Sequence, residues 1–403
     1  MNDINRHWLN LARIRIYSAT VLVSLLIFEL RSARVSWKLY GMPNGFDFVT
    51  FWAASRLTLD GTPLKVYSIT VLAQTVKLIS PHIVTHGAWF YPPTFLLLVW
   101  PLALLPGAIS FLVFIVVTTT IFAHLLRKVL PMSLAFLPII AFPGLWINAA
   151  QGQNACLTAS LALGAFLLLR RRPILAGVCI GMLAIKPHLA ILFPLALACA
   201  GMWVAFIAAA VTVVLFTGLS IAVFGTTVVP IFFHSLHDAN RYVATGAISW
   251  AQMASVFATL RQVHIGIMPA YVAQACMAIA AAGAVIWVWR NSQELEVQAT
   301  ALVAGTFMCS PYLFNYDTVW LGIPIVLITA KALQNGWLRW EREILFACWL
   351  YPVLGYFAGY GLHLDFGPII FAALLFVAIR RAHRQKYAPA RDLACAAPAA
   401  CRG

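Results

Sequence analysis

The sequence predicts an all-α integral membrane protein that crosses the bilayer about 11–13 times. Of its 403 residues, 62% are hydrophobic and only 10% are charged, whereas soluble domains carry about a quarter charged residues. Apolar runs long enough to cross a bilayer recur along the whole chain. These runs are continuous rather than alternating, which favours transmembrane helices over a β-barrel.

The charge and the cysteines exclude several soluble classes. The net charge of +15 has an ordinary cause in a membrane protein, because basic residues collect in cytoplasmic loops, and a nucleic-acid role is therefore not favoured. Of the eight cysteines, six lie inside apolar runs and two in the C-terminal tail. Because no CxxC pair is present, we interpret the cysteines as small apolar residues rather than as a zinc or redox site.

The N-terminal part predicts one span followed by a long outer segment. We expect the first span at residues 14–30, and it lacks a small-residue cleavage site. Arginines before it predict a cytoplasmic N-terminus. Residues 31–91 then form an extracytoplasmic segment. Its amphipathic stretches at 46–59 and 66–79 are expected to be helices on the membrane surface.

The remaining spans complete a single transmembrane domain over residues 1–387. We expect them at 92–105, 107–126, 132–147, 154–169, 173–185, 187–200, 203–224, 268–289, 297–313, 317–331, 344–360 and 366–379. Four apolar runs lie between the outer segment and the arginine triplet Arg170–Arg172. If all four crossed the bilayer, the triplet would lie outside, whereas arginines collect in cytoplasmic loops. One of the four runs should therefore be interfacial or re-entrant. Residues 388–403 are Ala/Pro-rich and are predicted to be a disordered cytoplasmic tail.

Two ionisable residues stand out as candidates for chemistry. Asp47 precedes the first surface stretch, where an aspartate is either a helix N-cap or a catalytic carboxylate. Lys186 follows an apolar segment and precedes Pro187. A lysine there either snorkels to the interface or holds a lipid phosphate at a broken helix.

Other polar groups have plainer interpretations. The stretch from Gln151 to Asn154 is a turn or part of a site, and Asn315-Tyr316-Asp317 is a helix cap or part of a site. His234, His237 and Asp238 are better explained as solvated loop residues than as metal ligands.

Five ordered segments together resemble glycosyltransferase family 87, a family of integral-membrane GT-C enzymes. The resemblance covers about residues 44 to 320. Its segments are Asp47-Phe48 through Arg56 with Gly61 and Tyr67, Tyr91-Pro92-Pro93 with residues 101–106, Gly152-Gln153-Asn154, Ala176-Gly177 through Gly181 to Lys186-Pro187, and Ser310-Pro311-Tyr312 with Tyr316-Asp317. Trp52 stands in place of the usual tyrosine, and Asn315 lies where a histidine is common, so we transfer no role to Asn315.

The resemblance implies transfer of a hexose, with mannose as the expected sugar, from a polyprenyl-phosphate donor to a lipid or glycan acceptor. The reaction would take place on the extracytoplasmic face of the inner membrane, with inversion, and would require no cofactor or divalent metal. Asp47 would be the general base, and Lys186, His188 and Arg56 would hold the donor phosphate. The substrate cavity would be formed by Trp52, Tyr91, Gln153, Asn154, Tyr312 and Asp317. We therefore expect Asp47 and Lys186 to open on one cavity.

Three alternatives remain open on the sequence alone. A lipid or solute transporter is the first, although matching broken repeats are not visible. A GT-C transferase with another sugar is the second, because sugar identity depends on a few pocket contacts. The third is an assembly or scaffold subunit that has kept the fold and lost activity.

Overall fold

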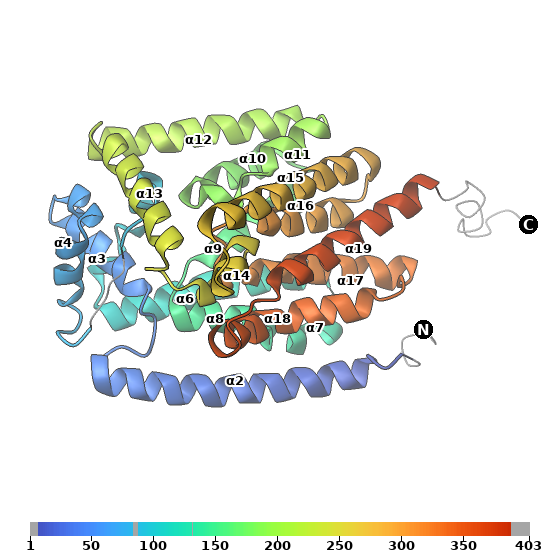
Figure 1. Cartoon of the computed structure of the whole chain (residues 1–403), viewed down its shortest axis with the longest axis horizontal. Coiled ribbons are helices and arrows are strands. Elements are labelled where there is room, and N and C mark those ends of the chain that lie inside the picture. The colour runs from blue at the N-terminus through green and yellow to red at the C-terminus, as the bar shows by residue number, and fades with distance from the viewer. Residues whose placement is uncertain (1–6, 84–87, 131, 388–403) are drawn as a thin grey trace, which may run out of the picture.

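The computed structural model describes residues 7–83, 88–130 and 132–387, and within these ranges the protein is all-α (Figure 1). The only strand-like pairing in the described part is an isolated bridge between Met253 and Phe314. Six helical segments are long and apolar enough to cross a membrane. They are α2 (Leu11–Tyr40), α6 (Gly107–Val129), α12 (Trp203–Phe224), α15 (Ile267–Asn291), η6 with α17 (Asn315–Leu321 and Gly322–Asn335) and α18 (Glu341–Gly361).

Shorter helices fill the remaining predicted spans. These are α5 (Pro93–Val99) with η2 (Leu102–Leu104), α7 (Met132–Ile140), α8 (Pro143–Gln151), α9 (Ala155–Leu168), α10 (Pro173–Met182) with η3 (Leu183–Ile185), η4 (Pro187–Leu189) with α11 (Phe193–Cys199), and α16 (Leu295–Cys309). The C-terminal helix is α19 (Gly367–Tyr387). The all-α polytopic class is thus confirmed, and several predicted spans are too short to cross a bilayer alone.

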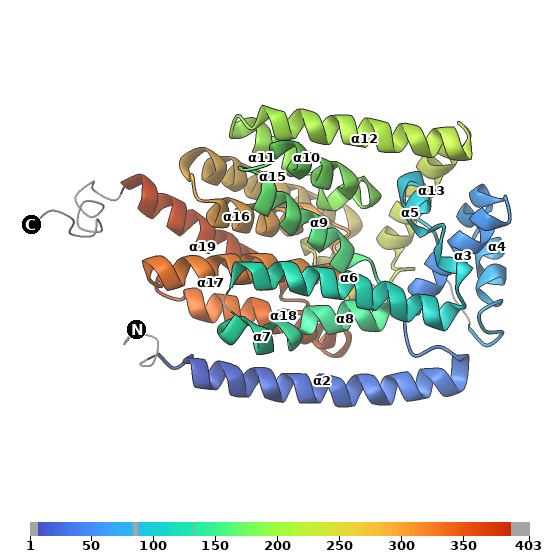
Figure 2. The same cartoon turned by 180° about the vertical axis from the view of Figure 1, so that it is seen from behind.

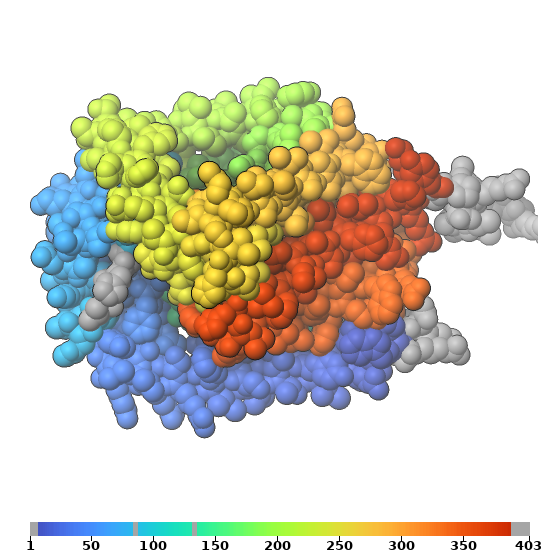
Figure 3. Space-filling model, in the orientation of Figure 1, coloured from blue at the N-terminus to red at the C-terminus, as the bar shows by residue number. Residues whose placement is uncertain are grey.

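The outer helices run along the long axis of the molecule. Figures 1 and 2 show α2 along one edge and α12 along the opposite edge, with the other long helices between them. The start of α2 and the end of α19 lie at one end, and α3 (Phe48–Leu59) and α4 (Ile69–Val76) lie at the other. Figure 3 shows one face covered by α13 (Val228–Thr245), α14 (Val256–Gln262), α18 and α19.

The first outer segment differs from the prediction in two ways. Helix α2 continues to Tyr40 instead of ending near residue 30. Helix α3 is not a surface helix, because every residue from Phe48 to Ser55 is buried. It packs against α4, α5, α6 and the short helices η1 (Pro63–Tyr67) and η2. The second amphipathic stretch forms η1 and α4.

Small residues bring α10 close to α12. A Cβ added at Gly177 would lie 2.5 Å from the carbonyl oxygen of Ala205, and one at Gly181 would lie 2.4 Å from Cβ of Thr212. Glycines four positions apart allow this close approach, which favours helix association within a bilayer. The contact fixes the segment that leads directly to Lys186.

Candidate active site

Asp47 is held beside the turn between α8 and α9. Its backbone N–H donates to the carbonyl of Gln151, and its Oδ2 accepts a hydrogen bond of 2.9 Å from Nε2 of Gln153. Although Asp47 directly precedes α3, its side chain makes no capping hydrogen bond. This geometry does not support the N-cap interpretation, and it leaves a half-buried carboxylate for chemistry.

Gly152 makes this approach possible. It ends α8 with φ of +75°, a conformation that residues with a Cβ rarely adopt. A Cβ at this position would also lie 2.7 Å from Cβ of Phe48 and 2.8 Å from Cα of Gly45. The Gly152-Gln153-Asn154 segment is therefore a turn and a part of the site at the same time.

Gln153 connects Asp47 to Tyr91. The hydroxyl of Tyr91 donates to Oε1 of Gln153 at 3.0 Å, which leaves the amide Nε2 of Gln153 to face the carboxylate. Burial raises the pKa of Tyr91 well above its usual value, so the phenol stays protonated and keeps donating. Burial also raises the pKa of Asp47, while the Gln153 hydrogen bond and the charge of Lys186 oppose that rise.

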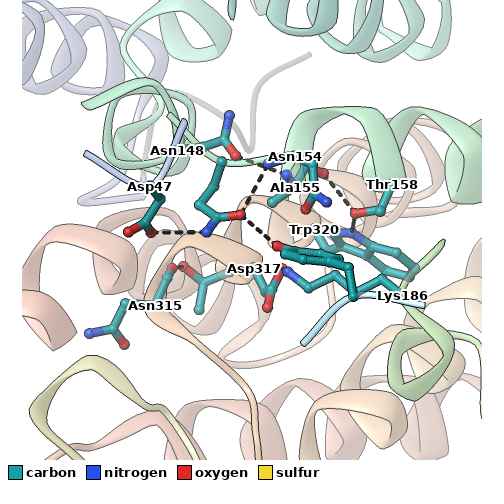
Figure 4. Close-up of polar contacts among 12 residues, drawn as sticks. Asp47, Asn148, Asn154, Ala155, Thr158, Lys186, Asn315, Asp317 and Trp320 are labelled. Atoms are coloured by element: carbon teal, nitrogen blue, oxygen red, sulfur yellow. Dashed lines mark hydrogen bonds and ion pairs between the residues drawn. The ribbon is translucent and has the colours of Figure 1, made fainter. Parts of the chain in front are cut away.

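Lys186 lies at a break between two short 3₁₀ helices, η3 and η4. Proline at 187 cannot continue the helix, and Thr94 donates to the nearby carbonyl of Ala184 at 3.1 Å. The Lys186 side chain is buried rather than snorkelling. Its Nζ lies 2.6 Å from Oδ1 of Asp317 (Figure 4). It also lies 4.5 Å from the ring centre of Tyr316.

One cavity of about 870 Å³ brings these groups together. Asp47 and Lys186 both line it, as the sequence predicts, although 139 positions separate them. Four further predicted residues line the same cavity: Tyr91, Gln153, His188 and Tyr312. Asp317 joins it through Lys186, and the buried side chain of Asn154 follows Gln153 directly.

Several buried polar atoms near this cavity lack a protein partner. They include Nε2 of His188, Oδ2 of Asp317 and both side-chain polar atoms of Asn154. Buried polar groups in folded proteins are normally hydrogen-bonded. An unpaired cluster beside a buried lysine is suited to a polar or anionic ligand.

Three residues singled out in the sequence do not join this cluster. Arg56 is exposed, pairs with Asp60 at 3.0 Å and does not line the cavity, so its assignment to the donor phosphate gains no support from the structure. Trp52 is buried within the α3 packing and donates to the carbonyl of Leu105. Asn315 donates to the carbonyl of Ala251, at 3.2 Å, and does not line the cavity.

Sequence reasoning also missed contributors to the site. Tyr316 entered only as part of a motif, but its ring lies under the Lys186 ammonium. Gln252 and Asn240 line the cavity without any sequence signal that would have selected them. His234 and Asp238 form an ion pair on α13 at 3.4 Å, with the His234 side chain 79% exposed. Within the described residues no group of three or more His, Cys, Asp or Glu side chains could hold a metal ion.

Comparison with known proteins identifies the family. No curated protein and no solved structure matched this chain. The model of glycosyltransferase family 87 matches residues 89–311, which is more than half of the chain and includes the Gln153 and Lys186 segments. This family match favours a transferase over the transporter alternative. The chain therefore belongs to glycosyltransferase family 87 and is a membrane glycosyltransferase.

Proposed function

We propose that the protein transfers a hexose, in the first instance mannose, from a polyprenyl-phosphate donor to a hydroxyl of a lipid or glycan acceptor. The observation that supports this most directly is the shared cavity, which presents a half-buried carboxylate and a buried cation to one space. The unpartnered Nε2 of His188 beside that cation adds a second donor for phosphate oxygens.

In this reaction Asp47 is the general base. It takes the proton of the acceptor hydroxyl as that oxygen attacks the anomeric carbon of the donor. The new bond joins the acceptor oxygen to the anomeric carbon, and the bond from that carbon to the phosphate oxygen breaks, so the configuration inverts. Polyprenyl phosphate leaves with the bonding electrons.

Lys186 and His188 stabilise the leaving phosphate. A phosphate leaves as an anion and needs no proton, but it does need positive charge or hydrogen-bond donors in a site with little water. Lys186 offers both, and Asp317 orients its ammonium at 2.6 Å. Tyr91 and Gln153 act as positioning residues. Tyr91 donates to Gln153, and the amide of Gln153 donates to the carboxylate of Asp47 and orients it.

The distribution of basic residues supports an orientation with both termini in the cytoplasm. Arg127 and Lys128 end α6, Arg290 lies at the end of α15, and Arg384 lies near the end of α19. Positive charge of this kind collects on the cytoplasmic side. The end that carries α3 and α4 would then face outward, and the membrane would be the inner membrane.

The test is transfer of radiolabelled mannose from polyprenyl-phosphate-mannose in membranes that contain equal amounts of wild type, Asp47→Asn or Asp60→Asn. Asp60 is the matched control, since it flanks the other end of α3 and is exposed. We expect transfer by the wild type and by Asp60→Asn, and loss of transfer in Asp47→Asn. Equal transfer by all three would remove Asp47 as the base, and transfer only from another polyprenyl-linked sugar would correct the sugar.

A further inference from the structure

Asp47 lines a second cavity, of about 590 Å³, on the side of α2. Its walls come from α2, α8 and α18. Among the described residues, only Asp47 and Gln252 line both this cavity and the first one. The carboxylate therefore stands where two separate spaces meet. Such an arrangement suits an inverting transfer, because the acceptor hydroxyl beside the base and the leaving phosphate must lie on opposite faces of the anomeric carbon.

The two cavities differ in charge. Lys186 and His188 line the first cavity, whereas the described residues that line the second include no lysine, arginine or histidine. The acidic side chains among the described residues that line the second cavity are Glu29 and Asp47. The second cavity therefore offers no cation to a phosphate, whereas its carboxyl oxygens can accept hydrogen bonds from the hydroxyls of a neutral sugar.

A hydrogen-bond network holds the carboxylate of Glu29 in place. Its Oε2 accepts from Nδ2 of Asn44 at 2.9 Å, and Oδ1 of Asn44 accepts from the hydroxyls of Ser32 and Ser36, both at 2.9 Å. Asn44 has φ of +131°, which is costly for a residue with a Cβ. A strained backbone that fixes a carboxylate beside a cavity is typical of a binding site.

The lining changes from polar to apolar along α2. Glu29, Ser32, Asn44 and Gln151 lie near the Asp47 end, and apolar side chains such as Val21, Leu25, Ile147 and Val353 line the rest. From Ser32 to Val21 the helix rises about 16 Å. Aromatic side chains, among them Trp146 on α8 and Tyr356 on α18, also line the cavity. This profile fits an amphiphile with a sugar head at Asp47 and a hydrocarbon tail along α2.

We propose that the second cavity binds the acceptor, that the acceptor is a neutral glycolipid, and that Glu29 recognises a hydroxyl of its sugar. This rests on the proposed function. The helix that forms one wall faces the lipid, since Val23, Leu26, Ile27 and Leu30 on α2 are exposed apolar residues. The acceptor therefore enters from the membrane past α2, which forms an edge of the molecule (Figure 3).

The test uses the full-length protein in liposomes, with dodecyl and methyl glycosides of mannose, glucose and galactose as acceptor probes. We compare the wild type, Glu29→Gln, Ser24→Trp and Ile27→Trp. Ser24 lines the cavity, and Ile27 is the matched control on the outward face of the same helix. Initial rates give the KM for acceptor and donor, and binding of the dodecyl glycosides is measured without a donor.

We expect a dodecyl glycoside to have a KM about tenfold or more below that of its methyl counterpart. Glu29→Gln and Ser24→Trp should raise that acceptor KM about tenfold to a hundredfold, the loss expected when a hydrogen bond to a charged group or access to a site is removed. The donor KM and the behaviour of Ile27→Trp should match the wild type.

Equal KM values for dodecyl and methyl glycosides, or unchanged acceptor KM in both cavity variants, would overturn the assignment. Failure of the proposed function gives a different pattern. The wild type would then transfer no sugar from any polyprenyl-phosphate donor, while binding of a dodecyl glycoside would still be lost in Ser24→Trp and kept in Ile27→Trp.

Discussion

The ion pair between Lys186 and Asp317 should contribute to stability and to catalysis in ways that can be separated. Its atoms are 2.6 Å apart, and the two side chains are 5% and 0% exposed. Removing one member of a buried pair leaves an uncompensated charge and costs about 3–5 kcal/mol, whereas removing both charges costs far less. Lys186→Met and Asp317→Asn should each lose about that much free energy of unfolding. The double variant should be more stable than either single variant.

The assay combines unfolding by detergent titration in mixed micelles with sugar transfer by the same preparations. Lys186→Met and the double variant should both lack transfer, because neither carries the ammonium that would stabilise the leaving phosphate. Restored stability without restored activity would separate the two roles. Strictly additive losses of stability would contradict a coupled buried pair, and an active double variant would contradict the role of Lys186.

A second buried pair serves as the control. Arg381 and Glu341 lie 2.7 Å apart with side chains 7% and 0% exposed, one in the last part of α19 and the other at the start of α18. Arg381→Met should destabilise the protein by a similar amount. The folded fraction should nevertheless keep the donor KM of the wild type, because this pair lies outside both cavities.

Three other predictions concern pH and backbone geometry. Burial raises the pKa of Asp47 and its base form must be ionised, so kcat/KM should fall as the pH drops through that raised value. Gln153→Leu removes a hydrogen bond to the charged form and should move the acid limb of the pH profile to still higher pH; an unmoved limb would argue against Asp47 as the titrating base. Gly152→Ala should cost more stability and activity than Gly201→Ala, as judged by detergent titration and transfer rate. Both glycines have positive φ, which costs a residue with a Cβ about 1–2 kcal/mol. Only at Gly152 would the added Cβ also clash with neighbouring atoms. Equal losses in the two variants would contradict this account. Burial raises the pKa of Asp365 from 3.8 to about 6, so the folded state binds this proton more tightly than the unfolded state. The free energy of unfolding should therefore decline as the pH rises from about 4 to 6. In unfolding titrations, Asp365→Asn should lack this decline.

The sequence predicts helices well where composition is uniform. The span expected at 203–224 coincides with α12, because its apolar residues continue without a charge to both ends. The end of α2 was missed because Arg31, Arg34 and Lys38 resemble the start of a polar segment. A helix that leaves the bilayer continues into water with its backbone bonds intact, and charge on its surface does not end it.

The mistake at α3 has a different cause. Asp47, Arg56 and Asp60 suggested a polar face, but the two aspartates flank the helix and only Arg56 lies within it. A helix surrounded by neighbours on all sides is apolar nearly all round, and the interior of α3 fits that description. Which neighbours cover it could not be read from the sequence, since they come from segments that are distant along the chain.

The site could be predicted only as separate parts. Asp47 and Lys186 were identified because an ionisable group is costly at membrane depth. The partners that decide between the alternatives are long-range: Gln153 lies 106 positions from Asp47, and Asp317 lies 131 positions from Lys186. On residue pattern alone, the N-cap interpretation of Asp47 was better supported than a catalytic one, and the snorkelling interpretation of Lys186 was as well supported as phosphate binding.

Both halves of the buried ion pair come from places where regular α-helix is interrupted. Lys186 separates two 3₁₀ turns, and Asp317 lies in η6, a 3₁₀ segment that runs into α17. Non-helical backbone at membrane depth is tolerated only where protein buries it or where it lines a water-filled cavity. Two such interruptions that meet at one cavity, each supplying a charge to the other, are hard to explain as packing alone. Their cost is understandable if the cavity must present a cation to an anionic leaving group, which is the role that the stability and activity measurements on Lys186 and Asp317 would isolate.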